Sequence, residues 1–132
     1  MKVLLTNGSP HRNGCTYTAL CEVAEALNKN GIDTDIFWIG NKPVSGCIAC
    51  KTCVKNNKCV FNDTVNEFLD IAGDYDGFVF GTPVHWGGAS GNMTSFMDRV
   101  FMWRWPTFPF KTCCYSHFSK TSRNNSNLGS GK

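Results

Sequence analysis

Blocks of hydrophobic and polar positions follow one another along the first forty residues and predict a strand, a helix and a second strand. The apolar run at residues 2–6 ends in the turn-forming sequence of residues 7–10, which predicts a buried strand. Between residues 20 and 27 apolar side chains recur at helical spacing, and Gly31 is suited to end that helix. Residues 33–39 predict the second strand. The order strand, helix, strand is typical of a parallel sheet.

The same pattern continues to about residue 101. Thr64 and Glu67 predict a capping box at the start of a second helix. Residues 76–81 are almost continuously apolar, as in a strand that is covered on both faces of a doubly wound sheet. Apolar residues from Met93 to Phe101 recur at helical spacing and predict a third helix that begins at Ser90. We therefore expect an α/β fold with a doubly wound parallel sheet and the strand order 2-1-3.

After residue 102 the periodicity ends. Residues 103–109 combine two prolines with aromatic residues, and residues 116–132 are polar, without apolar spacing. Five β-α units of ~30 residues need about 150 residues, more than this chain has. We expect residues 1–102 to form an incomplete domain and residues 103–132 an irregular, disordered tail. Strands 4 and 5 would then be missing or replaced by that tail.

The formal net charge of +3 is unevenly distributed. Residues 1–102 contain eight basic and ten acidic residues, whereas residues 103–132 contain five basic residues and no acidic one. The basic character thus belongs to the predicted tail, and we expect no nucleic-acid partner.

The role of the eight cysteines depends on the cellular compartment of the protein. The longest aliphatic run near the start is Val3–Leu5, far shorter than the roughly 7 to 15 apolar residues of a signal peptide or the ~20 of a membrane span. We therefore expect a cytoplasmic protein without a membrane partner. In that compartment cysteines indicate metal, cluster or redox chemistry rather than disulfides.

The loop from Gly8 to Thr16 has the composition of an anion site. Hydroxyls, backbone N–H groups and the start of a helix converge there, which favours a bound phosphate. Cys15 stands where a P-loop has lysine, and the glycines lack the spacing of a dinucleotide fingerprint. An ordinary capped turn is the alternative. The candidate phosphate-binding residues are Ser9, His11, Arg12, Asn13, Gly14 and Thr16.

A second loop, from Gly81 to Gly88, follows the third strand. With the order 2-1-3 it lies beside the first loop, where open parallel sheets bind ligands. Trp86 offers a flat apolar face, and the glycines let backbone N–H groups approach a planar heterocycle. A structural turn is the alternative. The candidate ring-binding residues are Pro83, Val84, His85, Trp86 and Gly87.

These two loops resemble the NADPH-dependent FMN reductase family of flavodoxin-like proteins. The likeness covers about residues 1–101 and rests on these segments: Gly8-Ser9-Pro10, Asn13-Gly14, Thr16, Gly81-Thr82-Pro83-Val84, Trp86 and Asp98-Arg99-Val100-Phe101. It departs at His11, where the family often has arginine, and at Cys15, where a small polar residue or asparagine is usual. The resemblance implies a flavodoxin-like fold with FMN as cofactor and NAD(P)H as electron donor. It also implies a homodimer that passes electrons to a small-molecule acceptor or a redox protein.

Four cysteines form a compact motif, Cys47-x2-Cys50-x2-Cys53-x5-Cys59. Four thiolates within so short a segment can surround one metal centre, and the spacing is similar to the ferredoxin run. The motif resembles that of the iron-sulfur flavoproteins, a branch of the same family in which the cysteines hold a [4Fe-4S] cluster next to FMN. Tetrahedral zinc and unligated thiols are the open alternatives.

The predicted function is an NAD(P)H-dependent flavin oxidoreductase using bound FMN, in which a [4Fe-4S] cluster would relay single electrons. The chain shows no Ser-His-Asp set and no paired carboxylates, so we predict no catalytic side chain, because the cofactor itself carries out the redox chemistry. The alternatives are a non-catalytic metal-binding or electron-carrier module built on the four cysteines, and an inactive truncated product.

The genetic code adds an expectation about the end of the chain. If the codons of residues 111–125 are read one base later, Cys113 and Cys114 become Ala or Val and their neighbours become mostly β-branched or small, as in a buried strand. We therefore predict that residues after about Phe101 come from a shifted reading frame, and that this chain is weakly active or inactive. A genuine disordered tail is the alternative.

Overall fold

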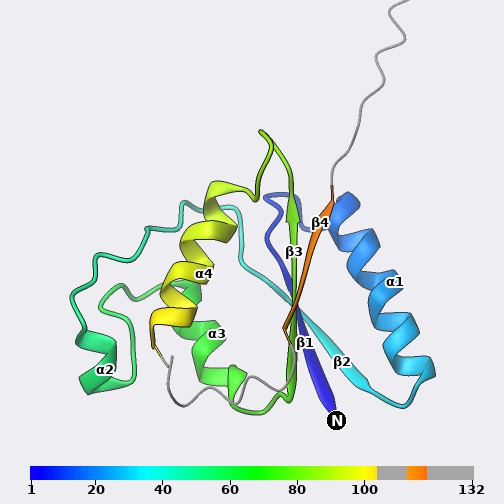
Figure 1. Cartoon of the computed structure of the whole chain (residues 1–132), viewed down its shortest axis with the longest axis horizontal. Helices are drawn as coiled ribbons and strands as arrows, with labels where there is room; N and C mark the ends of the chain where they lie inside the picture. Colours follow the sequence, from blue (N-terminus) through cyan, green and yellow to red (C-terminus); the bar gives the residue numbers. More distant parts are fainter. Residues whose placement is uncertain (104–112, 119–132) are drawn as a thin grey trace, which may run out of the picture.

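The computed structural model describes residues 1–103 and 113–118. In these residues a parallel four-stranded sheet with the order β2-β1-β3-β4 is covered by helices on both faces (Figure 1). Helix α1 covers one face, and α3 and α4 cover the other. The elements in chain order are β1 (Lys2–Asn7), α1 (Cys15–Lys29), β2 (Asp33–Trp38), α2 (Thr52–Asn56), α3 (Thr64–Ala72), β3 (Gly77–Pro83), α4 (Gly91–Trp103) and β4 (Cys113–Phe118).

The predicted order 2-1-3 is confirmed. Leu5 of β1 lies between Ile36 of β2 and Val79 of β3, and both pairings are parallel. Strand β1 is central and buried, and its side chains alternate between the two faces, so Leu4 and Leu5 belong to different core clusters.

The larger core lies between the sheet and helices α3 and α4. Its centre is aromatic: the Phe68 and Phe96 rings meet edge to face with centroids 5.1 Å apart, and Phe80 from β3 packs beside Phe68. The core under α1 is smaller and is built around fully buried Leu20. Phe80 also meets Phe101 of α4 edge to face at 5.7 Å, so aromatic packing fixes α4 against β3 and positions the loop that joins them.

Two predicted helix boundaries are confirmed. Gly31 follows α1 with a φ of +76° and its N–H bonds to the carbonyl of Asn28, while the next N–H bonds to Leu27, which is the Schellman arrangement. At the start of α4 the N–H of Met93 donates to the Ser90 hydroxyl at 3.3 Å, so Ser90 caps that helix.

The predicted start of α3 needs a correction. Its N-cap is Asp63, whose carboxylate accepts from the N–H of Val65 at 3.1 Å, and Thr64 is the first helical residue. Aspartate and threonine are both good N-caps, and Asp63 prevails because its carboxylate also binds Arg99. The short helix α2, inside the cysteine segment, was not predicted because five residues show no periodicity.

The prediction of no regular element after residue 102 is wrong at one place. Strand β4 pairs in parallel with β3, from Phe78 opposite Cys113 to Pro83 opposite Phe118. Tyr and Phe favour strands, and pairing satisfies the otherwise open backbone edge of β3. Because the sequence lacks a clean apolar alternation there, the pattern did not reveal a strand. Residues 104–112 and 119–132 of the predicted tail lie outside the described residues.

In the part of the chain that is described, no helix has the length and apolar character needed to cross a membrane.

Candidate functional site

The two predicted binding loops lie side by side at the carboxyl edge of the sheet. The N–H of Gly8 donates to the carbonyl of Gly81 at 2.8 Å, and the Ser90 hydroxyl donates to the carbonyl of Gly8 at 3.4 Å. Loops that are far apart in the sequence are therefore joined by direct bonds. Their adjacency follows from the strand order, because β1 and β3 are neighbours.

A buried asparagine shapes the first loop. The side chain of Asn7 accepts from the N–H of Ser9 at 3.0 Å and donates to the carbonyl of Arg12 at 3.1 Å. The Ser9 hydroxyl oxygen accepts from the N–H of His11 at 3.1 Å, so its own proton remains to be donated to a ligand. Asn7 was not among the predicted site residues, although a polar residue at the end of a buried strand is a usable signal.

The start of α1 can hold an anion. Its N-cap is Gly14, which makes no side-chain capping bond, so the first-turn N–H groups are not capped by a side chain and carry the positive end of the helix dipole. A Cβ on Gly14 would meet the Cβ of His11 at 3.3 Å, so glycine lets the loop fold closely. Ser9 and Thr16 are buried, whereas His11, Arg12 and Asn13 are exposed.

A tryptophan of β2 supports the same loop. The Nε1 of Trp38 donates to the carbonyl of Ser9 at 2.8 Å, and the Arg12 guanidinium lies 5.6 Å from the Trp38 ring centroid. This cation-π contact holds the positively charged side chain of Arg12 against Trp38, next to the backbone of its own loop. The sequence placed Trp38 only in a strand, because no local pattern links it to a loop 29 positions earlier.

The second loop is a narrow turn closed at its base. Thr82 and Ser90 are hydrogen bonded and buried, and Val84 forms an isolated bridge with Ala89. Gly87 adopts a φ of +65°, which glycine tolerates without strain. Trp86 is 96% exposed. The faces of its ring are therefore accessible to a planar ligand.

The four predicted metal-binding cysteines lie in the segment that joins β2 to α3, and they line one pocket together with residues of α4. None of these four cysteines forms a disulfide; Cys47 and Cys50 are exposed, and Cys53 and Cys59 are half-buried. The pocket is also lined by Arg99. Burial raises the pKa of the Cys53 thiol, and the nearby Cys59 and Cys47 add to that rise. Among residues 1–103 and 113–118, no three or more His, Cys, Asp or Glu side chains are arranged to hold a single metal ion.

The backbone of this cysteine segment is strained. Ala49, Lys51 and Asn57 all have φ between +55° and +58°, and no other non-glycine residue in the described chain has a positive φ. Such a conformation costs about 1–3 kcal/mol per residue and is found mainly at functional sites. The strain therefore marks residues 47–59 as a segment whose path is held by specific contacts.

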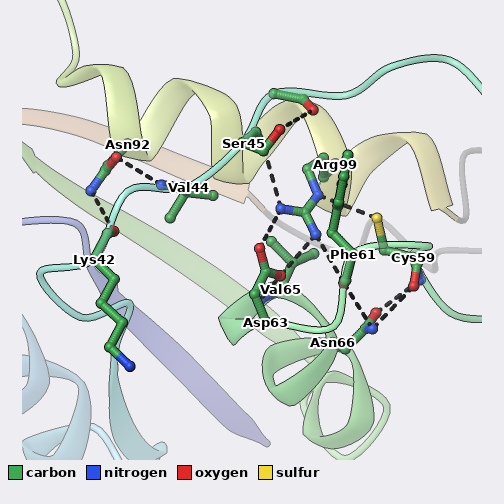
Figure 2. Close-up of polar contacts among 11 residues, drawn as sticks. Lys42, Val44, Ser45, Cys59, Phe61, Asp63, Val65, Asn66, Asn92 and Arg99 are labelled. Atoms are coloured by element: carbon green, nitrogen blue, oxygen red, sulfur yellow. Dashed lines mark hydrogen bonds and ion pairs between the residues drawn. The ribbon is translucent and has the colours of Figure 1, made fainter.

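Arg99 of α4 provides such contacts (Figure 2). Its side chain is 1% exposed and forms a bidentate pair with the Asp63 carboxylate at 2.6 and 2.8 Å. The remaining N–H groups donate to the carbonyls of Ser45 and Phe61, each at 3.2 Å, and to the sulfur of Cys59 at 3.3 Å. Burial opposes the charged form, but the bonds with Asp63 and Cys59 outweigh it and raise the pKa of Arg99 above its ordinary value.

The two candidate sites lie at different ends of α4. The Trp86 loop leads into the N-terminus of that helix, whereas Arg99 and Met102 line the cysteine pocket near its C-terminus. At 1.5 Å per residue, Ser90 and Arg99 are roughly 13 Å apart along the helix axis. One helix thus connects both sites.

Known proteins are similar to this chain in sequence and in fold. The sequence profile of a family described as NADPH-dependent FMN reductase matches residues 1–115. An iron-sulfur flavoprotein of Methanocaldococcus jannaschii is 35% identical over 99 residues, which are 75% of this chain and 51% of the relative. The chain spans about half the length of the curated relatives it matches.

Solved structures agree on the fold. A flavone reductase superposes with a TM-score of 0.57 and 25% identity, over 75% of this chain and 29% of the other. RosB, solved with a bound 8-demethyl-8-formylriboflavin-5'-phosphate, superposes with a TM-score of 0.65 and 13% identity, over 91% and 52% of the two chains, which shows likeness of fold alone. The chain therefore belongs to the NADPH-dependent FMN reductase family, as its loop motifs predicted, with iron-sulfur flavoproteins among its relatives.

Proposed function

We propose that this chain is the flavin-binding part of an FMN-dependent oxidoreductase. The observation that carries the proposal is the direct bonding of a phosphate-type loop to a loop with an exposed tryptophan, at the carboxyl edge of a parallel sheet. When bound, FMN supplies the redox chemistry, accepting a hydride from NAD(P)H and passing electrons to an acceptor. The protein needs only to bind and orient the cofactor.

The first loop is suited to the FMN phosphate. The uncapped first turn of α1 offers backbone N–H groups, the Ser9 hydroxyl retains a proton to donate, and Arg12 adds a positive charge held by Trp38. Asn13 extends the exposed polar edge of the same loop. Thr16 is buried, so its hydroxyl would act from inside the loop.

The second loop is suited to the flavin ring. Trp86 can stack on a planar heterocycle, and the narrow turn from Pro83 to Gly87 exposes backbone groups that can bond to the polar edge of the ring. His85 is exposed beside Trp86. Bonds between the bases of the two loops keep the phosphate and ring subsites at one spacing.

The cysteine pocket is suited to an iron-sulfur cluster. A tetrahedral zinc ion needs four sulfurs about 2.3 Å from one point, whereas a [4Fe-4S] cluster takes one thiolate on each iron and so fits sulfurs spread around a larger pocket. Cys47, Cys50, Cys53 and Cys59 line one pocket, and among the described residues their thiols are not arranged to hold a single metal ion. We propose that a cluster bound there relays single electrons. The names of the curated relatives support this assignment.

A second candidate function is a metal-binding electron carrier without flavin. It is favoured by the separation of the cysteine pocket from the two flavin loops along α4, because the pocket requires neither loop. In both cases we expect a homodimer in the cytoplasm, with a small-molecule acceptor or a redox protein as partner.

The visible spectrum of the purified protein, prepared without oxygen and supplied with FMN, iron and sulfide, separates these functions. A resolved flavin absorption that stays with the protein through gel filtration is expected for the oxidoreductase. A broad sulfur-to-iron band without flavin would instead support the carrier. A colourless protein that contains zinc would contradict both the flavin and the cluster assignments.

A further inference from the structure

We propose that Arg99 is the positioning residue of the four-cysteine segment, holding both ends of residues 47–59 and donating a hydrogen bond to the Cys59 sulfur that binds the cluster. This inference rests on the proposed cluster at that pocket. Figure 2 shows the guanidinium of α4 between the two ends of the segment.

The contacts of Arg99 bracket the cysteines on both sides. Ser45, two positions before Cys47, accepts at 3.2 Å, and Phe61, two positions after Cys59, accepts at 3.2 Å. A planar guanidinium holds its five donors in fixed directions, and all five are used in these bonds. One buried group on a regular helix thus fixes where the strained segment begins and where it ends.

Contacts from two helices hold both the backbone and the sulfur of Cys59. Its N–H donates to the side chain of Asn66 at 2.8 Å, and its carbonyl accepts from the same side chain at 3.1 Å. Asn66 is buried in α3. With the sulfur held by Arg99 as well, the backbone and the thiol of Cys59 are set before any ligand binds, whereas Cys47 and Cys50 are exposed.

The sulfur bond is separate from the ion pair. The two terminal nitrogens of Arg99 bind Asp63, while Nε, which the ion pair does not use, donates to Cys59. A hydrogen bond from a cation to a ligand sulfur stabilises the more negative, reduced cluster and therefore raises its reduction potential. Lysine can keep the charge but has no Nε–H in this position.

Arg99→Lys is therefore the informative variant. Lys58→Gln is its matched control: Lys58 is adjacent to Cys59 but exposed, and it pairs with Asp70 rather than with a sulfur. Three quantities are measured in each protein: iron, sulfide and FMN content, the midpoint potential of the cluster, and hydrogen exchange of the metal-free protein. We expect Arg99→Lys to keep FMN. We expect a potential more negative by about 59 mV, a tenfold change in a one-electron equilibrium constant.

In the metal-free protein, we expect Arg99→Lys to speed backbone exchange in residues 45–63 by about tenfold while the central strand β1 is unchanged. Lys58→Gln should match the wild-type protein in potential and exchange. An unchanged potential in a fully loaded Arg99→Lys protein would overturn the sulfur bond, and unchanged exchange would overturn the positioning role.

A measurement on the wild-type protein covers the case in which the variant does not fold. With arginine labelled by nitrogen-15, pulsed electron paramagnetic resonance of the reduced cluster should detect a coupling to a guanidinium nitrogen. A loaded cluster without that coupling would contradict the inference. If the wild-type protein binds no iron, the proposed cluster is wrong, and the exchange comparison alone decides whether Arg99 positions the segment.

Discussion

A single buried guanidinium connects three segments that are distant in the sequence. Placing an arginine in a nonpolar interior is unfavourable unless its charge is balanced and its donors are bonded. Arg99 meets both conditions through Asp63 and three further acceptors. The sequence identified residues 98–101 as a family segment but could not predict the contact with Cys59, because the two residues are 40 positions apart and neither lies in a pattern that refers to the other.

Asp63 combines two roles that substitutions can separate. It caps α3 and neutralises Arg99. Asparagine keeps the capping oxygen but not the charge, so Asp63→Asn should lower the free energy of unfolding by about 2 kcal/mol, less than the ~3–5 of a fully buried pair because Asp63 is 31% exposed. Asp63→Ala should cost about 1 kcal/mol more, the value of the cap.

Urea denaturation of the three proteins in the absence of metal measures both steps. Equal stability of Asp63→Asn and the wild-type protein would show that the buried charge of Arg99 does not need the negative charge of Asp63 to be stable.

At the scale of single elements, the sequence predicted what local patterns encode. The ends of α1 and α4 follow from Gly31 and Ser90, whose roles depend on neighbours within four positions. The path of the cysteine segment was not predictable, because contacts from α4 to Ser45 and from α3 to Cys59 hold its two ends, and three left-handed residues lie between them. Asparagine adopts this conformation readily, but local propensity would not choose it for Ala49 or Lys51.

The start of α1 carries a prediction about FMN. Ser9→Ala combined with Thr16→Ala should weaken FMN binding by at least about tenfold, because a hydrogen bond to a charged phosphate contributes about 1.5–3 kcal/mol. Thr18→Ala is the control, since its hydroxyl lies on the same first turns but donates to the carbonyl of Gly14. Fluorescence titration with FMN measures the three dissociation constants. Unchanged affinity in the double variant would mean that the phosphate binds elsewhere.

The cysteine segment carries a separate prediction about metal. Cys50→Ser should abolish stoichiometric iron and leave FMN binding intact, because no residue that lines the cysteine pocket belongs to either flavin loop. Cys21→Ser, in α1 and outside the motif, should retain both. Iron and flavin analysis of the reconstituted proteins measures this. Iron retained by Cys50→Ser would exclude the four-cysteine ligand set, and joint loss of flavin would show that the segment supports the whole fold.

At the scale of the whole molecule, strand β4 changes the predicted sheet from three strands to four. Three strands were predictable because β1, β2 and β3 each contain a run of apolar residues and are bounded by turns. The fourth was not, since Cys113–Phe118 lacks that signal and pairs only with β3 in the described sheet. The prediction of a shifted reading frame loses the support that it drew from a missing strand. The absence of acidic residues after Asp98 still supports that prediction. Sequencing the DNA around codon 101 tests whether the reading frame is shifted.

The pairing of β4 has a testable consequence for the whole sheet. Consecutive residues of an edge strand direct their N–H groups alternately toward the neighbouring strand and away from it. Proline removes that donor. Of the variants Tyr115→Pro and Ser116→Pro, one should therefore lose a bond to β3 and the other should not.

We expect one variant to unfold with a free energy lower by about 1–2 kcal/mol and with faster hydrogen exchange in β3, while its neighbour stays closer to the wild-type protein. Each variant is the other's control, because both place a proline within the same strand. Urea denaturation and exchange in residues 77–83 measure the difference. Two variants that match the wild-type protein would contradict the pairing of β4 with β3, and β3 would then be the last strand of the sheet on the side of the Trp86 loop.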